Sequence, residues 1–130
     1  MSCEIKTIVL LSMLFLHIVD DYYLQGILAQ MKQRTWWFNN YPDKKYEDDY
    51  IMALMEHAFS WSFMIHIPVG IAVIYMNGSF SHLFFLFFVN WIIHAVIDNL
   101  KANYLAFNLA QDQMIHITQI VITWTILMFK

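Results

Sequence analysis

Charge is scarce in this 130-residue chain, since Asp, Glu, Lys and Arg together make up only 13% of it. Soluble domains usually contain about 25% charged residues, so the composition is unlike theirs. The single cysteine, Cys3, excludes an internal disulfide and any zinc module built from several cysteines. With three glycines and two prolines, the chain is neither collagen-like nor of low complexity. A formal net charge of −3 gives no basis for binding nucleic acid.

Hydrophobic residues take the place of the missing charge and amount to 60% of the chain. From His57 to Ile97, 41 consecutive residues include no Lys, Arg, Asp or Glu. A bilayer-spanning helix needs roughly 20 apolar residues, so this stretch has room for two spans. The dipeptide Asn77-Gly78 marks the turn between them, because Asn-Gly breaks regular structure. Two more stretches with little or no charge, 7–31 and 113–129, can each hold one further span.

The sequence therefore predicts a single all-α domain over residues 1–130, an integral membrane four-helix bundle. The helices are expected at about 5–31, 48–76, 79–103 and 110–129. A loop at 32–47 joins the first two helices, and its polar character extends to residue 49.

The positive charges predict the orientation of this bundle. Because successive helices alternate in direction, the 32–49 loop and the short connection near 102–110 lie on the same side. That side carries five Lys or Arg residues, whereas the opposite side has Lys6 and Lys130. The positive-inside rule then places the 32–49 loop in the cytoplasm and both termini outside.

Histidine and aspartate recur at one spacing inside the predicted spans. Three pairs lie four residues apart, namely His17 with Asp21, His94 with Asp98, and Asp112 with His116. Residues four apart on a helix share nearly the same face. His57 adds a histidine from the remaining helix. At about 1.5 Å rise per residue, all seven groups fall within roughly 5–16 Å of the same membrane face, where they can converge.

Converging imidazoles and carboxylates are typical of a metal site. They are the ligands of zinc, iron and manganese, and a cation offsets the cost of burying several aspartates. We therefore predict a divalent metal, zinc as first choice and iron or manganese as second. The predicted ligands are His17, Asp21, His57, His94, Asp98, Asp112 and His116. Gln25 and Gln113, which lie close to these ligands along the chain, are expected to orient them by hydrogen bonds.

Metal-assisted hydrolysis is the reaction that this site suits best, because a bound metal lowers the pKa of water toward about 7. A site at the depth of the lipid headgroups favours a membrane lipid or a similar amphiphile as substrate. In this hypothesis His57 and Asp112 are either ligands or catalytic bases. Asp20, which precedes Asp21, points about 100° away from it and is expected to pair with Lys101 or to face the loop side.

Structural roles for the same residues stay open beside this hypothesis. Asp98 and Asp112 lie near helix ends, where a carboxylate is often merely solvated or caps a helix. A metal-free His/Asp network that serves helix packing, assembly or proton and ion handling is the main alternative. A second alternative is a non-catalytic accessory protein that forms a homo-oligomer or acts on a host membrane partner through the 32–49 loop.

Four short motifs in order along the chain carry a family resemblance. They are His17-Ile-Val-Asp-Asp-Tyr-Tyr-Leu-Gln25, Leu54-Met-Glu-His57, His94-Ala-Val-Ile-Asp98-Asn-Leu-Lys101 and Asp112-Gln113-Met-Ile-His116. In this pattern the chain resembles domain-of-unknown-function family 3307, a group of small bacterial and phage membrane proteins with no established activity. The resemblance implies a bacterial or host inner membrane as location. It also implies that Lys101 belongs with the other site residues, while Asp20 departs from the family pattern.

Overall fold

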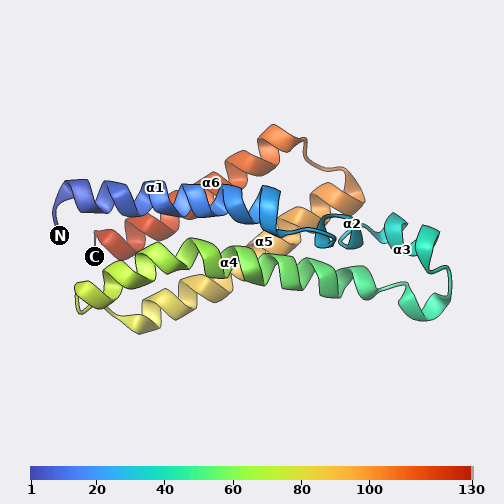
Figure 1. The fold of residues 1–130 in the computed structure, drawn as a ribbon, viewed down its shortest axis with the longest axis horizontal. Coiled ribbons are helices and arrows are strands. Elements are labelled where there is room, and N and C mark those ends of the chain that lie inside the picture. Colours follow the sequence, from blue (N-terminus) through green and yellow to red (C-terminus); the bar gives the residue numbers. More distant parts are fainter. Residues whose placement is uncertain (130) are drawn as a thin grey trace.

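The computed structural model describes residues 1–129, and these residues form helices and turns without any β-strand. The expected all-α class is therefore confirmed. Four long helices run alongside one another, with both chain ends at the same end of the molecule (Figure 1). They are α1 (Cys3–Val19), α4 (Asp49–Tyr75), α5 (Phe80–Tyr104) and α6 (Leu109–Met128). Lys130, used above to predict the orientation, lies outside the described residues.

The first expected helix, 5–31, is interrupted, so that prediction is wrong at its C-terminal part. After α1 the chain widens into one π-helical segment, η1 (Asp20–Leu24). Gly26 then adopts φ +50°, a left-handed conformation that glycine reaches without steric cost. The helix resumes only as α2 (Leu28–Met31). A π-turn and a glycine thus end the straight helix one turn beyond His17, at the level where the polar residues gather.

The expected polar loop contains structure of its own, α3 (Arg34–Asn40) and the 3-10 segment η2 (Lys44–Tyr46). The Trp37 indole nitrogen donates to the carbonyl of Met31 at 2.6 Å and holds α3 against the end of α2. Asn103, near the end of α5, accepts from the Arg34 amide at 2.7 Å. The loop is therefore attached to the end of the bundle.

The other three helices agree with the expected ranges to within a few residues, and local residue types explain where they end. Asn77 takes a left-handed φ of 51° at the tight turn between α4 and α5. α6 begins at a capping box in which the Asn108 side chain accepts from the Gln111 backbone N–H and the Gln111 side chain accepts from the Asn108 backbone N–H. This cap fixes Asp112 in the first turn of α6.

The apolar core fills the half of the bundle that is nearer the chain termini. Its most buried large side chains include Met13, Trp61, Ile65, Val69 and Ile120, none of which is measurably exposed. The His and Asp residues occupy the next layer toward the loop end. The apolar core thus borders the polar layer on one side, and α2 and α3 lie on the other side of that layer (Figure 1).

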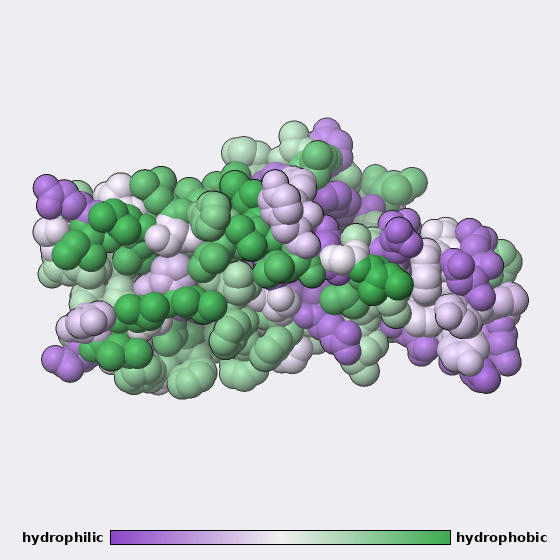
Figure 2. Space-filling model, viewed as in Figure 1, coloured by the Kyte–Doolittle hydropathy of each residue, from purple (hydrophilic) through white to green (hydrophobic). Residues whose placement is uncertain are grey.

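Within residues 1–129, two segments have the length and apolar composition of a membrane span, Lys44–Tyr75 and Phe80–Tyr104. α1 has 17 residues, a rise of about 26 Å, which by itself is shorter than the hydrocarbon layer. The surface is mostly apolar along the bundle and becomes hydrophilic over α3 and η2 (Figure 2). The expectation of membrane spans is therefore supported for two of the four long helices.

Candidate metal centre

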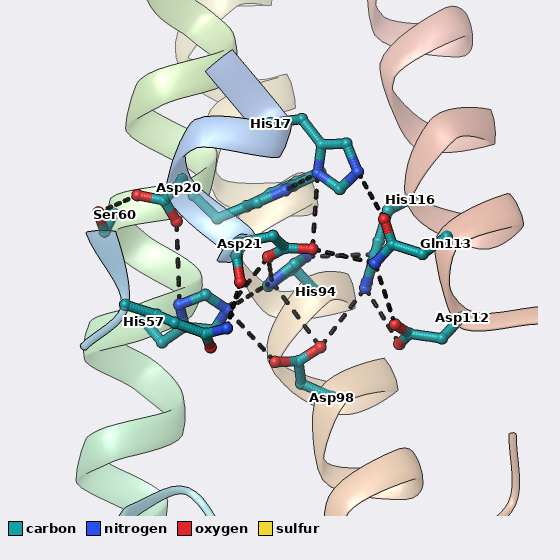
Figure 3. A network of polar contacts seen from close by, with 12 residues as sticks. His17, Asp20, Asp21, His57, Ser60, His94, Asp98, Asp112, Gln113 and His116 are labelled. Atoms are coloured by element: carbon teal, nitrogen blue, oxygen red, sulfur yellow. Dashed lines mark hydrogen bonds and ion pairs between the residues drawn. The ribbon is translucent and has the colours of Figure 1, made fainter. Parts of the chain in front are cut away.

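The seven predicted ligands form one buried cluster between the four long helices (Figure 3). His17 comes from α1, Asp21 from η1 and His57 from α4, while α5 and α6 supply two residues each. The most exposed of the seven is Asp21, with 8% of its surface accessible. Residues four apart on three helices, together with one histidine on the fourth, therefore meet in one layer.

Asp21, His57 and His94 form a first group whose ligand atoms lie close enough together to hold one metal ion. His57 Nε2 lies 3.4 Å from Asp21 Oδ1 and 3.3 Å from His94 Nε2. The remaining edge, from His94 Nε2 to Asp21 Oδ1, measures 3.8 Å. Zinc ligands at about 2.0–2.1 Å in tetrahedral geometry lie roughly 3.3–3.4 Å from one another. The three atoms thus have close to the spacing of ligands around one ion.

His94, Asp98 and His116 form a second group that shares His94 with the first. Asp98 Oδ1 lies 3.4 Å from His116 Nε2 and 3.9 Å from His94 Nε2. Asp112 Oδ1 approaches His116 Nε2 from the other side, at 3.2 Å. His94 is fully buried, and the Trp61 ring stacks on it at 4.1 Å between centroids.

Several ligand-type atoms in this cluster have no hydrogen-bond partner. Within residues 1–129 these unpaired buried atoms include Asp20 Oδ2, His57 Nδ1, Asp112 Oδ1 and His116 Nε2. A buried polar atom that lacks a partner costs about 1–3 kcal/mol, and native proteins seldom leave one so. These four atoms face one another in two pairs, Asp112 Oδ1 with His116 Nε2 at 3.2 Å and Asp20 Oδ2 with His57 Nδ1 at 3.8 Å, so the cluster keeps donor and acceptor atoms that its own contacts do not fully satisfy.

His17 stands beside the ligand atoms and has both ring nitrogens engaged. The Trp61 indole donates to Nδ1 at 2.7 Å, which places the proton of a neutral ring on Nε2. Nε2 then donates to Gln113 Oε1 at 3.0 Å. With both nitrogens satisfied by protein groups, His17 acts as a support of the cluster in this structure, in contrast to its expected place among the ligands.

The residues expected to orient the ligands do contact them. Gln113 Nε2 donates to Asp21 Oδ2 at 3.1 Å and to Asp112 Oδ2 at 3.2 Å. Gln25 donates to the backbone carbonyl of Asp21. Lys101 forms an ion pair of 2.5 Å with Asp112 Oδ2.

Four further residues of the cluster were missed by sequence reasoning or assigned elsewhere. Asp20 neither pairs with Lys101 nor faces the loop side, because it is fully buried and accepts from Ser60 Oγ at 2.5 Å. Ser60 and Trp61 follow His57 by three and four residues. This spacing places them on the same face of α4 as His57 and could have been recognised in the sequence. The fourth, Lys32, forms a 2.6 Å ion pair with Asp98 Oδ2.

An open groove of about 550 Å³ runs beside the cluster along α1 and α6. Its lining combines apolar side chains, among them Leu14, Ile18 and Ile117, with His17 and Gln113. Since these last two residues also belong to the hydrogen-bond network of the cluster, the groove connects the apolar surface with the polar layer.

No family model, curated protein or solved structure matches this chain. The resemblance drawn from its short motifs therefore stays a prediction, and the assignment of a function depends on the geometry of the cluster.

Proposed function

We propose that the chain is an integral membrane protein whose four long helices cross or enter the bilayer. The support is the apolar surface of the bundle, which continues over all four helices. On α1, for example, Leu11 and Phe15 are at least 59% exposed. The same holds for Phe84 and Phe85 on α5. Apolar surface of this extent needs a nonaqueous environment or a partner. In this proposal the 32–49 loop is cytoplasmic and both termini lie outside, as the positive-inside rule favours.

Membrane insertion predicts how the protein behaves in cell fractions. We expect it to sediment with membranes and to stay there after an alkaline carbonate wash, because at least two helices would be surrounded by lipid. Extraction should require detergent. Immunoblotting of the washed pellet and supernatant measures the distribution, and release of the protein by carbonate alone would contradict insertion.

We also propose that the cluster binds a divalent metal ion, with His94 as the ligand common to both groups. The balance of buried charges supports this proposal as much as the distances between the ligand atoms do. Four carboxylates are buried here, from Asp20, Asp21, Asp98 and Asp112, and within residues 1–129 only Asp98 and Asp112 have an ammonium partner, Lys32 and Lys101 respectively. Neutral histidines would leave two negative charges uncompensated, and uncompensated buried charge is costly. One divalent cation supplies the missing charge.

Zinc fits the donor set best, and iron or manganese comes second. Neutral imidazoles with carboxylates are suitable ligands for all three metals. The spacing in the group of Asp21, His57 and His94 agrees with tetrahedral zinc, and three protein ligands leave a fourth position free, as in catalytic zinc sites.

The reaction that this arrangement supports best is hydrolysis of a lipid-like substrate. A metal with a free position supplies an activated water at neutral pH. Asp112 is placed to accept a proton, because Lys101 holds its Oδ2 while Oδ1 faces His116 Nε2 at 3.2 Å. The groove that includes His17 and Gln113 offers an amphiphile an apolar surface next to the cluster.

Hydrolysis is tested with zinc-loaded protein reconstituted in phospholipid vesicles that contain a fluorogenic ester lipid. We expect release of the fluorophore by the wild type and a decrease of about 100-fold or more in Asp112→Asn, the size of a lost proton-transfer group. His66→Ala is the control, since His66 is buried in α4 and its ring bonds to the Ser62 carbonyl of the same helix, away from the cluster. Release no faster than in protein-free vesicles would contradict hydrolysis and leave metal binding untouched.

A metal-free network is the second candidate, and parts of the cluster favour it. His17 is satisfied on both nitrogens by Trp61 and Gln113, and Asp98 and Asp112 each have a lysine partner. Such a network would bind helices together or carry protons. It predicts that no transition metal copurifies with the protein.

A further inference from the structure

Asp20 is fully buried and belongs to neither of the two metal-ligand groups. It lies between Ser60 and His57, which both come from α4 (Figure 3). Ser60 Oγ donates to Asp20 Oδ1 at 2.5 Å. The other oxygen, Oδ2, faces His57 Nδ1 at 3.8 Å. In the described part of the chain, neither of these two facing atoms has a hydrogen-bond partner.

The two nitrogens of His57 are directed at different groups. Nε2 faces Asp21 Oδ1 at 3.4 Å and His94 Nε2 at 3.3 Å, whereas Nδ1 faces Asp20. An imidazole that binds a metal through Nε2 carries its proton on Nδ1, and this N–H almost always donates to a carboxylate, a carbonyl or water. Asp20 stands where that acceptor is needed, and a shift of roughly 1 Å brings the pair to hydrogen-bond distance.

We propose that Asp20 and Ser60 position His57 for metal binding. Ser60 fixes the carboxylate of Asp20, and Asp20 holds the His57 ring with its proton on Nδ1 and its Nε2 lone pair toward Asp21 and His94. This inference rests on the proposed metal centre and assigns it two residues that do not touch the ion.

The arrangement is more specific than helix packing requires. If Asp20 served only to join η1 to α4, its hydrogen bond with Ser60 would suffice, and a neutral Asn would make it at less desolvation cost. A carboxylate whose second oxygen is left free beside an unpaired imidazole nitrogen is instead suited to stabilise the N–H of a ligand.

Zinc affinity of Ser60→Ala and Asp20→Ala tests this inference, measured by competition with a chromophoric chelator in detergent. Each variant should bind zinc about 10–100-fold more weakly than the wild type, as is typical of residues that orient a metal-binding histidine. Asp20→Asn should lose less, because its amide oxygen still accepts from Nδ1–H. Ser62→Ala is the matched control, since Ser62 donates to the Phe87 carbonyl on α5. Its zinc affinity should equal that of the wild type.

The proton position gives a readout that packing alone would not change. Long-range ¹⁵N–¹H NMR of histidine-labelled, zinc-loaded protein should show His57 protonated on Nδ1 with a slowly exchanging proton. The slow exchange should be lost in Asp20→Ala and kept in Ser62→Ala. Wild-type affinity and an unchanged His57 signal in Asp20→Ala and Ser60→Ala would overturn the positioning role alone. Failure of the wild type to bind zinc would overturn it together with the metal centre.

Discussion

Replacing His94 with alanine should weaken metal binding by more than about 100-fold, the largest effect expected of any single substitution. His94 belongs to both ligand groups, and its Nε2 lies 3.3 Å from His57 Nε2. Residues that only orient a ligand are already worth about 10–100-fold in affinity, so a ligand shared by both groups must be worth more. The measurement is chelator competition on detergent-purified protein.

The His94→Ala result needs a control for the loss of a buried imidazole. His66→Ala provides it, because His66 is 7% exposed and lies on α4 beyond the cluster. Its variant should keep wild-type affinity. Because Trp61 stacks on His94 and responds directly to its loss, circular dichroism, and not Trp fluorescence, reports whether the variant is folded. A folded His94→Ala protein with wild-type affinity would show that the metal, if bound, lies elsewhere.

Removing the metal should lower the thermal stability of the wild type by roughly 10–20 °C. A ligand present at about 1,000 times its Kd stabilises the folded state by about 4 kcal/mol, and each kcal/mol shifts the Tm of a chain of this size by several degrees. The physical cause is the buried charge of four aspartates, for which two lysines provide the only ammonium partners within residues 1–129. Thermal unfolding with and without a chelator, followed by Trp fluorescence, measures the shift.

If a metal bound at the cluster stabilises the protein, the decrease in Tm caused by the chelator must depend on the cluster residues. In His94→Ala it should be absent, since that variant binds little metal to begin with, and zinc added back should restore the Tm of the wild type only. Equal melting temperatures of the wild type with and without chelator would favour the metal-free network.

The sequence predicted the convergence of the polar residues because helical spacing and alternating helix direction are enough to place them. His94 and Asp98 share a face of α5, as Asp112 and His116 share a face of α6, and both helices meet at the loop end. The apolar stretches likewise predicted the four long helices. Both inferences depend only on regular helix geometry.

What the sequence could not predict depends on departures from that geometry and on contacts between helices. The π-turn of η1 and the left-handed Gly26 interrupt a segment that reads as one helix. Asp20, expected to point elsewhere, is buried because α4 covers it and Ser60 bonds to it. The hydrogen bond from Trp61 to His17 Nδ1 depends on how α1 and α4 are rotated relative to each other. No spacing rule predicts that rotation.

The metal content of the wild-type protein tests the central claim most directly. The protein would be extracted in detergent, purified through a tag that binds no metal and without chelators, and analysed by inductively coupled plasma mass spectrometry. Binding of a divalent ion at the His/Asp cluster predicts about one equivalent of transition metal per chain, with zinc the most abundant. A protein that is folded and metal-free, and that takes up no zinc, iron or manganese when these are added, would contradict it.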